Sequence, residues 1–226
     1  MGCWVGIDVG AVAVKVAVLA DGAAAERLRA DAPPEVLQPV ALPEASAGLS
    51  LWIAPARRTR GRPIDVARGM LDDVVTLVGR DDIAAMTVAG SGGPAVAERL
   101  GVRLVNEFKA IAAAAALVIP SVPTLFEMGG ETSKFILLDD AGGIVDYQTN
   151  GDCAAGTGSF LDQQAGRLHY EVDQIGGIVA GATRSAQIAG RCSVFAKSDM
   201  IHAQQKGYSP PEVLRGLCDA VARNYR

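Results

Sequence analysis

Apolar residues follow two spacings along the chain, and each spacing predicts a different kind of element. Short apolar runs bounded by Gly, Asp or Pro predict strands, whereas apolar residues three or four positions apart predict helices. The clearest helical spacing covers Ile64–Val78, where Val66, Met70, Val74 and Leu77 share one face. We therefore expect a helix there that packs one side against a core.

The other predicted elements alternate between the two types. The strands are Trp4–Val9, Val12–Leu19, Leu49–Ala54, Ile83–Ala89, Val102–Val105, Leu125–Met128, Lys134–Asp139 and Gly143–Gln148. The helices are one that opens at Gly90-Ser91-Gly92-Gly93-Pro94, one capped by Asn106 that runs to about Val118, Thr157 to about Leu168, Val194 to about Gln205, and Pro211–Asn224. Apart from Leu49–Ala54, the Pro-rich segment Arg27–Pro63 gives no clear pattern. This order of elements predicts a mixed α/β fold.

A break at Pro120–Pro123 divides the chain into two expected subdomains, residues 1–121 and 122–226. The two parts begin alike. With an offset of 119 residues and no gap, the matched positions are Asp8 and Glu127, Gly10 and Gly129, Lys15 and Lys134, Leu19 and Leu138, and Asp21 and Asp140. The sequence therefore predicts an internal duplication, in which an acid, a Gly turn and a Lys seven positions after the acid occur twice.

Each copy of this acid–Gly–Lys hairpin carries groups that suit a metal-bound phosphate. The carboxylates of Asp8 and Glu127 can hold Mg²⁺, and a Gly-rich turn presents backbone N–H groups to phosphate oxygens. Two facing copies would hold a triphosphate from both sides, so we expect Asp8 and Glu127 to be catalytic. The expected nucleotide contacts are Gly10, Ala11, Lys15, Gly129, Gly130 and Lys134. The alternative is that both segments are only hairpin turns.

Two of the four cysteines precede predicted helix starts. Cys153 lies in NGDCAAGTGSFLD, and Cys192 lies thirty-nine residues later in GRCSVFAKSD, where Ser193 can cap the second helix. A helix N-terminus carries positive potential, which favours a thiolate. A cubane iron–sulfur cluster takes four thiolates, so two copies about a two-fold axis would supply them. The expected set is Cys153 and Cys192 for the metal, with Gly156 or Thr157 as a helix cap and Gly156, Thr157 and Gly158 as cofactor contacts.

Other interpretations of the cysteines remain open. Cys153 and Cys192 can be buried structural thiols or part of a zinc site with histidine. Cys3 and Cys218 lie in apolar strand and helix contexts, so we expect them in the core.

Composition and charge exclude several classes of protein. The chain has 226 residues, 50% hydrophobic and 20% charged, with a net charge of −4, so nothing favours nucleic-acid binding. The apolar runs are too short for a membrane span, and the start does not resemble a signal peptide. Four cysteines do not suggest a secreted disulfide scaffold, so we expect a cytoplasmic protein. The basic run Arg57–Arg62 is expected to be a solvated loop.

The duplicated hairpin resembles the phosphate loops of the actin, Hsp70 and sugar-kinase superfamily of ATPases. That resemblance implies two ribonuclease-H-like subdomains with ATP and Mg²⁺ between them. The chain departs from the pattern in two ways. Ala11 and Val12 stand where many members have a small hydroxyl residue, and the chain stops at Arg226, before the expected adenosine-binding loop. The resemblance therefore implies a second subdomain that is incomplete.

A closer resemblance is carried by CAAGTGSFLDQQAGRL and GRCSVFAKSDMIHAQQKGY. Both stretches are similar to the activators of 2-hydroxyacyl-CoA dehydratases and the ATPase subunits of benzoyl-CoA reductase, the BadF/BadG/BcrA/BcrD family. The sequences of these stretches most resemble the first module of the long, tandem activase-like members of that family. The resemblance implies a homodimer that shares one [4Fe-4S] cluster through Cys153 and Cys192. It also implies ATP-driven transfer of a low-potential electron, from a donor such as ferredoxin or flavodoxin, to a dehydratase or reductase partner.

Three other functions remain as alternatives. One is a small-molecule kinase of the same superfamily, in which the paired cysteines would have no purpose. Another is a dinucleotide-binding domain, since Gly90-x-Gly92-x-x-Ala95 follows a strand and Glu107 lies downstream, but the motif is in mid-chain. The last is a non-catalytic ATPase-like module.

Overall fold

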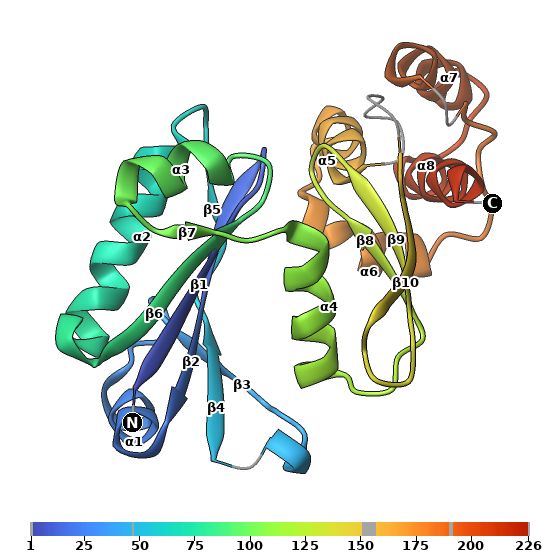
Figure 1. The fold of residues 1–226 in the computed structure, drawn as a ribbon. Coiled ribbons are helices and arrows are strands. Elements are labelled where there is room, and N and C mark those ends of the chain that lie inside the picture. The colour runs from blue at the N-terminus through green and yellow to red at the C-terminus, as the bar shows by residue number, and fades with distance from the viewer. Residues whose placement is uncertain (1, 47, 151–156, 190–191, 226) are drawn as a thin grey trace. The chain divides into compact units, whose positions relative to one another are not determined.

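The computed structural model describes residues 2–46, 48–150, 157–189 and 192–225. Contacts between residues divide the chain into two units (Figure 1). The first unit is Met1–Leu125 with Ile136–Tyr147, and the second is Phe126–Phe135 with Gln148–Arg226. Each unit has a hydrophobic core of its own.

The first unit is built on a mixed sheet. Strands β1 (Cys3–Val9) and β2 (Ala13–Asp21) form an antiparallel hairpin, and β6 (Ile83–Ala89) runs parallel to β1 on its other side. The other strands are β3 (Gln38–Val40), β4 (Leu49–Ile53), β5 (Arg57–Arg58) and β7 (Arg103–Leu104). Among the described residues the sheet has seven strands in the order β3-β4-β2-β1-β6-β7, with β5 paired to β2. The carboxyl ends of β1 and β6 therefore lie side by side.

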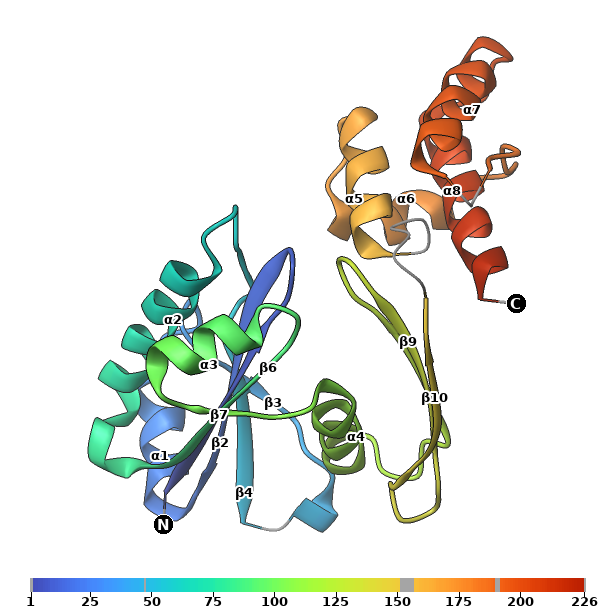
Figure 2. The same cartoon turned by 45° about the horizontal axis from the view of Figure 1, so that its top comes forward.

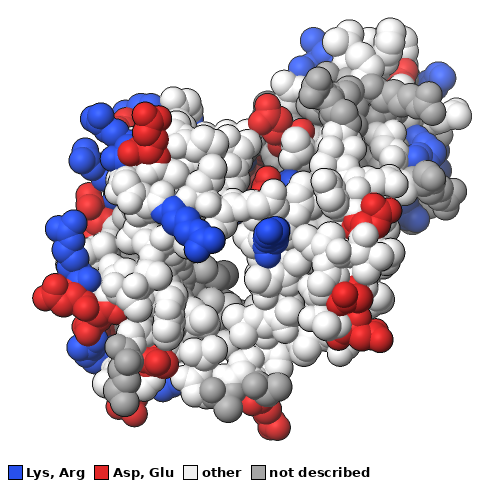
Figure 3. Space-filling model, in the orientation of Figure 1, with Lys and Arg blue, Asp and Glu red and all other residues white. Residues whose placement is uncertain are grey.

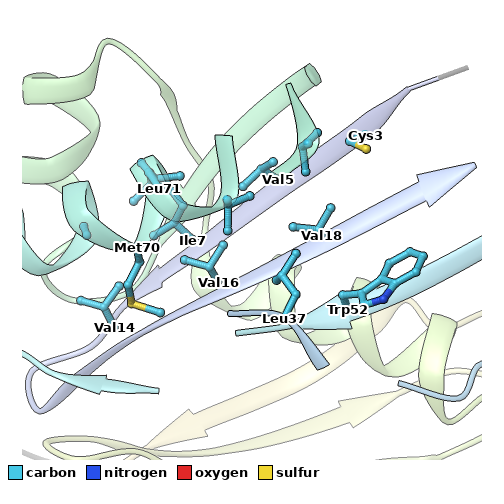
Figure 4. Close-up of a cluster of buried hydrophobic side chains, with 14 of the residues drawn as sticks. Cys3, Val5, Ile7, Val14, Val16, Val18, Leu37, Trp52, Met70 and Leu71 are labelled. Carbon is cyan, nitrogen blue, oxygen red and sulfur yellow. The ribbon is translucent and has the colours of Figure 1, made fainter. Parts of the chain in front are cut away.

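Side chains alternate along β1 and β2, so every second one enters the core. The buried set on these strands is Cys3, Val5, Ile7, Val9, Val14, Val16, Val18 and Ala20. Met70 and Leu71 of helix α2 (Pro63–Val78) pack over this face (Figure 4). Helices α1 (Gly22–Asp31) and α3 (Gly93–Leu100) add further side chains to the same core. The predicted helix and its apolar face are confirmed, since Met70 and Val74 are buried.

Helix α4 (Glu107–Val118) begins where the sequence predicts. The side-chain oxygen of Asn106 accepts a hydrogen bond from the N–H of Lys109 at 3.2 Å, which satisfies one N–H of the first turn. Buried alanines of α4 pack against Ile136 and Leu138 of β9 (Ser133–Leu138) in a small core within the first unit.

Strand β9 is the centre of a three-stranded sheet. Its neighbours are β8 (Thr124–Met128) and β10 (Ile144–Thr149), and the order is β10-β9-β8. The three predicted strands of this region are confirmed to within one or two residues at each end. Strands β8 and β9 each contribute residues to both units.

The second unit is mainly helical (Figure 2). Its helices are α5 (Gly158–Arg167), α6 (Ile175–Ala180), α7 (Ser193–Gln205) and α8 (Pro210–Asn224). Helix α8 supplies the centre of the core, with Val213, Leu214 and Leu217 at 1% exposure or less. Among the described residues, every helix is too short or too polar to cross a lipid bilayer.

The structure contains elements that the sequence did not predict. These are α1, α6, β3, β5 and the short 3-10 turns η1 (Glu44–Ser46), η2 (Arg80–Asp82) and η3 (Val172–Gln174). The expectation of a solvated loop over Arg57–Arg62 is wrong in part. Arg57 and Arg58 form β5 against β2, and Thr59 is only 6% exposed because its hydroxyl and N–H bond to the turn before β2.

Glu212 stabilises the start of α8. Its carboxylate accepts hydrogen bonds from Arg184 Nε at 2.7 Å and Nη2 at 3.0 Å, and from the N–H of Ser209 at 2.9 Å. The Arg184 side chain, and after it the Ser209 backbone, lower the pKa of Glu212 from 4.5 to about 2. Because the folded pKa lies below the unfolded one, this stabilisation is complete above about pH 4.5 and is lost as the pH falls towards 2.

We therefore expect the free energy of unfolding of Glu212→Gln to fall less steeply than that of the wild type between about pH 4.5 and pH 2. Urea unfolding at a series of pH values measures this. The matched control is Glu26→Gln, an exposed residue of α1, which should keep the wild-type dependence. Parallel curves for Glu212→Gln and the wild type would contradict the assignment.

Candidate functional site

The first hairpin brings Asp8 and Lys15 together at the carboxyl end of β1. The β1–β2 register places the two residues directly opposite each other, and Lys15 Nζ lies 2.8 Å from Asp8 Oδ2. The turn between the strands is closed by the N–H of Gly10, which donates to Ala13 O at 3.0 Å. Both charged side chains are open to solvent, at 56% exposure for Lys15 and 39% for Asp8.

The second hairpin repeats this arrangement with the same offset of 119 residues. Lys134 Nζ lies 2.9 Å from Glu127 Oε2, and the N–H of Gly129 donates to Thr132 O at 2.9 Å. The duplication in the sequence is therefore also a duplication of backbone and side-chain geometry. The copies differ in solvent access, because the side chain of Lys134 is only 4% exposed.

Gly10 and Gly129 have the same local role in the two hairpins. Each donates its N–H within its own turn, so neither N–H is available to a phosphate while the turn is closed. Within the described residues, the N–H groups of Ala11 and Gly130 donate no hydrogen bond. The N–H groups of Ala11 and Gly130 are thus better placed than those of Gly10 and Gly129 to donate to a ligand.

The loop after β6 lies against Asp8, which the sequence alone did not reveal. Gly90 has φ +94°, and a Cβ there would lie 2.5 Å from Val9 O and 2.6 Å from Asp8 Oδ1. The N–H of Gly92 donates to Val9 O at 2.8 Å. A glycine is required at position 90, both for its backbone conformation and for this close approach. In the sequence, this contact is indicated only by the Gly-rich turn that follows the predicted strand. That the strand lies parallel to β1 comes from the structure.

The second hairpin is bonded to the start of helix α5. The N–H of Gly158 donates to Gly129 O at 2.8 Å, and the N–H of Ser159 donates to Gly130 O at 3.3 Å. The first two N–H groups of α5 therefore have partners in the second hairpin. Thr157 is the residue before the helix and is fully buried, but its side chain makes no capping hydrogen bond there.

Cys192 is a free thiol at the start of α7. It is half-buried, and it is itself the residue before the helix, a position that the sequence assigned to Ser193. Cys153 and Gly156 lie outside the described residues. Within the described ranges, no group of three or more His, Cys, Asp or Glu side chains is placed to bind a metal ion.

Cys3 and Cys218 lie in hydrophobic surroundings. Both are free thiols, and burial raises the pKa of each. A raised pKa leaves less thiolate near neutral pH, and thiolate is the form that binds metal. Cys3 and Cys218 are therefore poorly suited to bind a metal ion.

Comparison with protein-family models matches residues 5–225 to the family described as the BadF/BadG/BcrA/BcrD ATPase family. The chain belongs to this family. The resemblance carried by the two cysteine segments is therefore confirmed.

Two relatives of this chain are named as activators of CoA-ester dehydratases. The activator of lactoyl-CoA dehydratase from Anaerotignum propionicum is 37% identical over 105 residues, which are 46% of this chain and 40% of the relative. The (R)-2-hydroxyglutaryl-CoA dehydratase activating ATPase from Acidaminococcus fermentans is 31% identical over 143 residues, which are 63% of this chain and 54% of the relative. The matches thus span about half the length of these family members.

Two solved structures share the fold of this chain. Component A of the (R)-2-hydroxyglutaryl-CoA dehydratase of Acidaminococcus fermentans matches with a TM-score of 0.76 at 24% identity, over 99% of this chain and 76% of that one. The activator of the 2-hydroxyisocaproyl-CoA dehydratase of Clostridium difficile, with bound ADPNP, matches with a TM-score of 0.69 at 22% identity, over 98% and 73%. The chain has the mixed α/β fold of the actin-like, ribonuclease-H-like ATPases, as the sequence predicted.

Proposed function

We propose that this protein is an ATP-dependent electron-transfer activator for an enzyme of the 2-hydroxyacyl-CoA dehydratase or benzoyl-CoA reductase type. The observation that carries the proposal is that one hairpin occurs twice, 119 residues apart. Each copy has the same turn hydrogen bond and an ion pair between a carboxylate and a lysine. Membership of an ATPase family and the named activators among the relatives support it. In this proposal the hairpins mark two ribonuclease-H-like subdomains, residues 1–121 and 122–226.

The two hairpins would hold the triphosphate and its metal. Asp8 and Glu127 are the proposed catalytic carboxylates and would hold Mg²⁺, directly or through water. Lys15 and Lys134 would neutralise phosphate charge once Mg²⁺ draws each carboxylate away. Backbone N–H groups at Ala11 and Gly130 would bind phosphate oxygens, and Gly10 and Gly129 keep the turns closed.

The cysteine segment would hold the electron carrier. Cys153 and Cys192 of two copies would ligate one [4Fe-4S] cluster, which when bound carries a single electron at low potential. Cys192 fits this role because it is free, half-buried and at a helix start. The donor would be a ferredoxin or flavodoxin. The free thiols of Cys3, Cys192 and Cys218 agree with a cytoplasmic location.

A direct route would link a bound nucleotide to the cysteine segment. The carbonyls of Gly129 and Gly130 accept hydrogen bonds from the first two residues of α5. Residues 151–156, which include Cys153, immediately precede Thr157 in the chain. A change of the Gly129–Gly130 backbone on binding phosphate would therefore move the start of α5. Nucleotides can shift such an equilibrium only if they bind its two states differently.

Binding of Mg²⁺-ATP to the wild type and to Asp8→Asn, measured by isothermal titration calorimetry, tests the proposal. We expect the variant to bind at least about tenfold more weakly, a loss of about 1.4 kcal/mol, because it lacks a charge beside the metal. The variant should remain folded, since the Asp8–Lys15 pair is exposed.

The matched control is Asp31→Asn, an exposed aspartate at the end of α1, which should bind like the wild type. Equal affinity of Asp8→Asn and the wild type would refute the assigned role of Asp8. Failure of the wild type to bind Mg²⁺-ATP would instead favour the alternative of a non-catalytic module.

A further inference from the structure

Four arginines surround one pocket in the first unit. Arg57, Arg58, Arg60 and Arg62 line a space of about 520 Å³ between β5 and the first turns of α2. Asp65 is the one carboxylate among its lining residues. Figure 3 shows Lys and Arg side chains, with acidic ones among them, gathered over this end of the unit. The volume lies in the range of small-molecule sites, which is about 300–1,000 Å³.

The loop that carries the arginines is fixed to the first hairpin. Strand β5 pairs with the start of β2, and the N–H of Thr59 donates to Val12 O at 2.8 Å. The buried Thr59 hydroxyl lies 3.1 Å from Ala11 O and 3.2 Å from Val12 O, so it can donate to either carbonyl. The basic pocket is thus built directly against the turn that follows Asp8.

The turn at the tip holds Arg60 in an unusual backbone conformation. The N–H of Arg62 donates to Thr59 O at 2.8 Å, and the two central residues, Arg60 and Gly61, have φ of +45° and +76°. This region suits glycine, whereas arginine rarely adopts it. An arginine thus stands at a position where a glycine would fit with less strain.

The positive charge of the pocket is only partly balanced. Arg57 forms an ion pair with Asp73 at 2.6 Å, and Arg58 also has an interaction partner. Within the part of the chain that the structure describes, Arg60 and Arg62 make no side-chain hydrogen bond or ion pair. Like charges held close together repel, and a bound anion would relieve that repulsion.

We propose that this pocket binds the phosphate groups of a small polyphosphorylated anion. Guanidinium groups bind phosphate oxygens in pairs of hydrogen bonds, and Arg60 and Arg62 are the proposed principal contacts. The phosphates can belong to a nucleotide or to an inorganic polyphosphate. Binding of tripolyphosphate tests the pocket whether or not the protein hydrolyses ATP, because tripolyphosphate has no nucleoside.

The experiment is calorimetric titration with tripolyphosphate at constant ionic strength. The test variant combines Arg60→Gly with Arg62→Gln, and Gly at position 60 suits the left-handed backbone, so folding is not at risk. The control combines Arg80→Gln with Arg167→Gln, two exposed arginines outside the pocket, and it changes the net charge equally. We expect about tenfold weaker binding in the test variant and less than a twofold change in the control.

A second variant, Arg60→Lys with Arg62→Lys, keeps the charge but removes the guanidinium fork. It should bind tripolyphosphate several-fold more weakly than the wild type. If ATP loses affinity in the Arg60→Gly, Arg62→Gln variant in parallel, the phosphates are those of the nucleotide. If ATP affinity is unchanged, the ligand is a separate polyphosphate. The proposal is overturned if the wild type does not bind tripolyphosphate, or if test and control variants lose affinity equally.

Discussion

The protein with both Cys153→Ser and Cys192→Ser should contain no bound iron after anaerobic purification. Serine has nearly the shape of cysteine but no thiolate, and thiolates are the ligands of an iron–sulfur cluster. Cys192 offers a free, half-buried sulfur at the start of α7. The wild type should show broad visible absorption and about two iron atoms per chain, as expected for one cubane shared by two copies.

The other two cysteines provide the matched control for this experiment. Cys3 is fully buried in β1 and Cys218 is half-buried in α8, and burial raises the pKa of both thiols. The variant with Cys3→Ser and Cys218→Ser should therefore keep the wild-type iron content. A conservative Cys3→Ala change can replace Cys3→Ser if the buried hydroxyl lowers stability. Full iron retention by the Cys153→Ser, Cys192→Ser protein would sink the cluster assignment.

Local features of the candidate site could be predicted from the sequence because they depend on nearby residues. The hairpin around Gly10 is closed by a hydrogen bond to a residue three positions away, and Asp8 pairs with Lys15 across the same turn. The cap of α4 likewise joins Asn106 to Lys109. Because the bonded residues lie close together in the sequence, such contacts can be recognised as a motif. The recurrence of the motif at a constant offset strengthened the prediction.

Contacts between distant segments could not be predicted in the same way. Gly90 approaches Asp8 only because β6 lies parallel to β1, and Thr59 reaches the Ala11 carbonyl only because β5 pairs with β2. Sheet order decides both contacts. No periodicity within either segment specifies its neighbour in the sheet.

Some elements were missed because their own residues give a weak signal. Helix α1 buries only Ala24, Ala25 and Leu28, so its sequence has no broad apolar stripe. Helix α6 contains Gly176 and Gly177, which disfavour a helix, and it forms where it packs against α8. Tertiary packing thus decides the structure where local preference is weak.

The two acid–lysine pairs should differ in their effect on stability, although the sequence makes them equivalent. Both side chains of the Asp8–Lys15 pair are open to water, at 39% and 56% exposure. In the Glu127–Lys134 pair the lysine side chain is 4% exposed, and its ammonium group also lies 3.2 Å from Thr132 Oγ1. Removing a carboxylate next to a buried ammonium costs more than removing one from an exposed pair.

We expect Glu127→Gln to lower the free energy of unfolding by about 2–3 kcal/mol and Asp8→Asn by less than about 1 kcal/mol. The first value lies below the roughly 3–5 kcal/mol of fully buried pairs because Glu127 is itself 32% exposed. Urea unfolding of both variants measures the difference. Adding Lys134→Met to Glu127→Gln should recover part of the loss, since methionine has a similar length and carries no charge to compensate. Equal losses in the two single variants, or a further loss in the double variant, would show that burial of Lys134 does not distinguish the two hairpins.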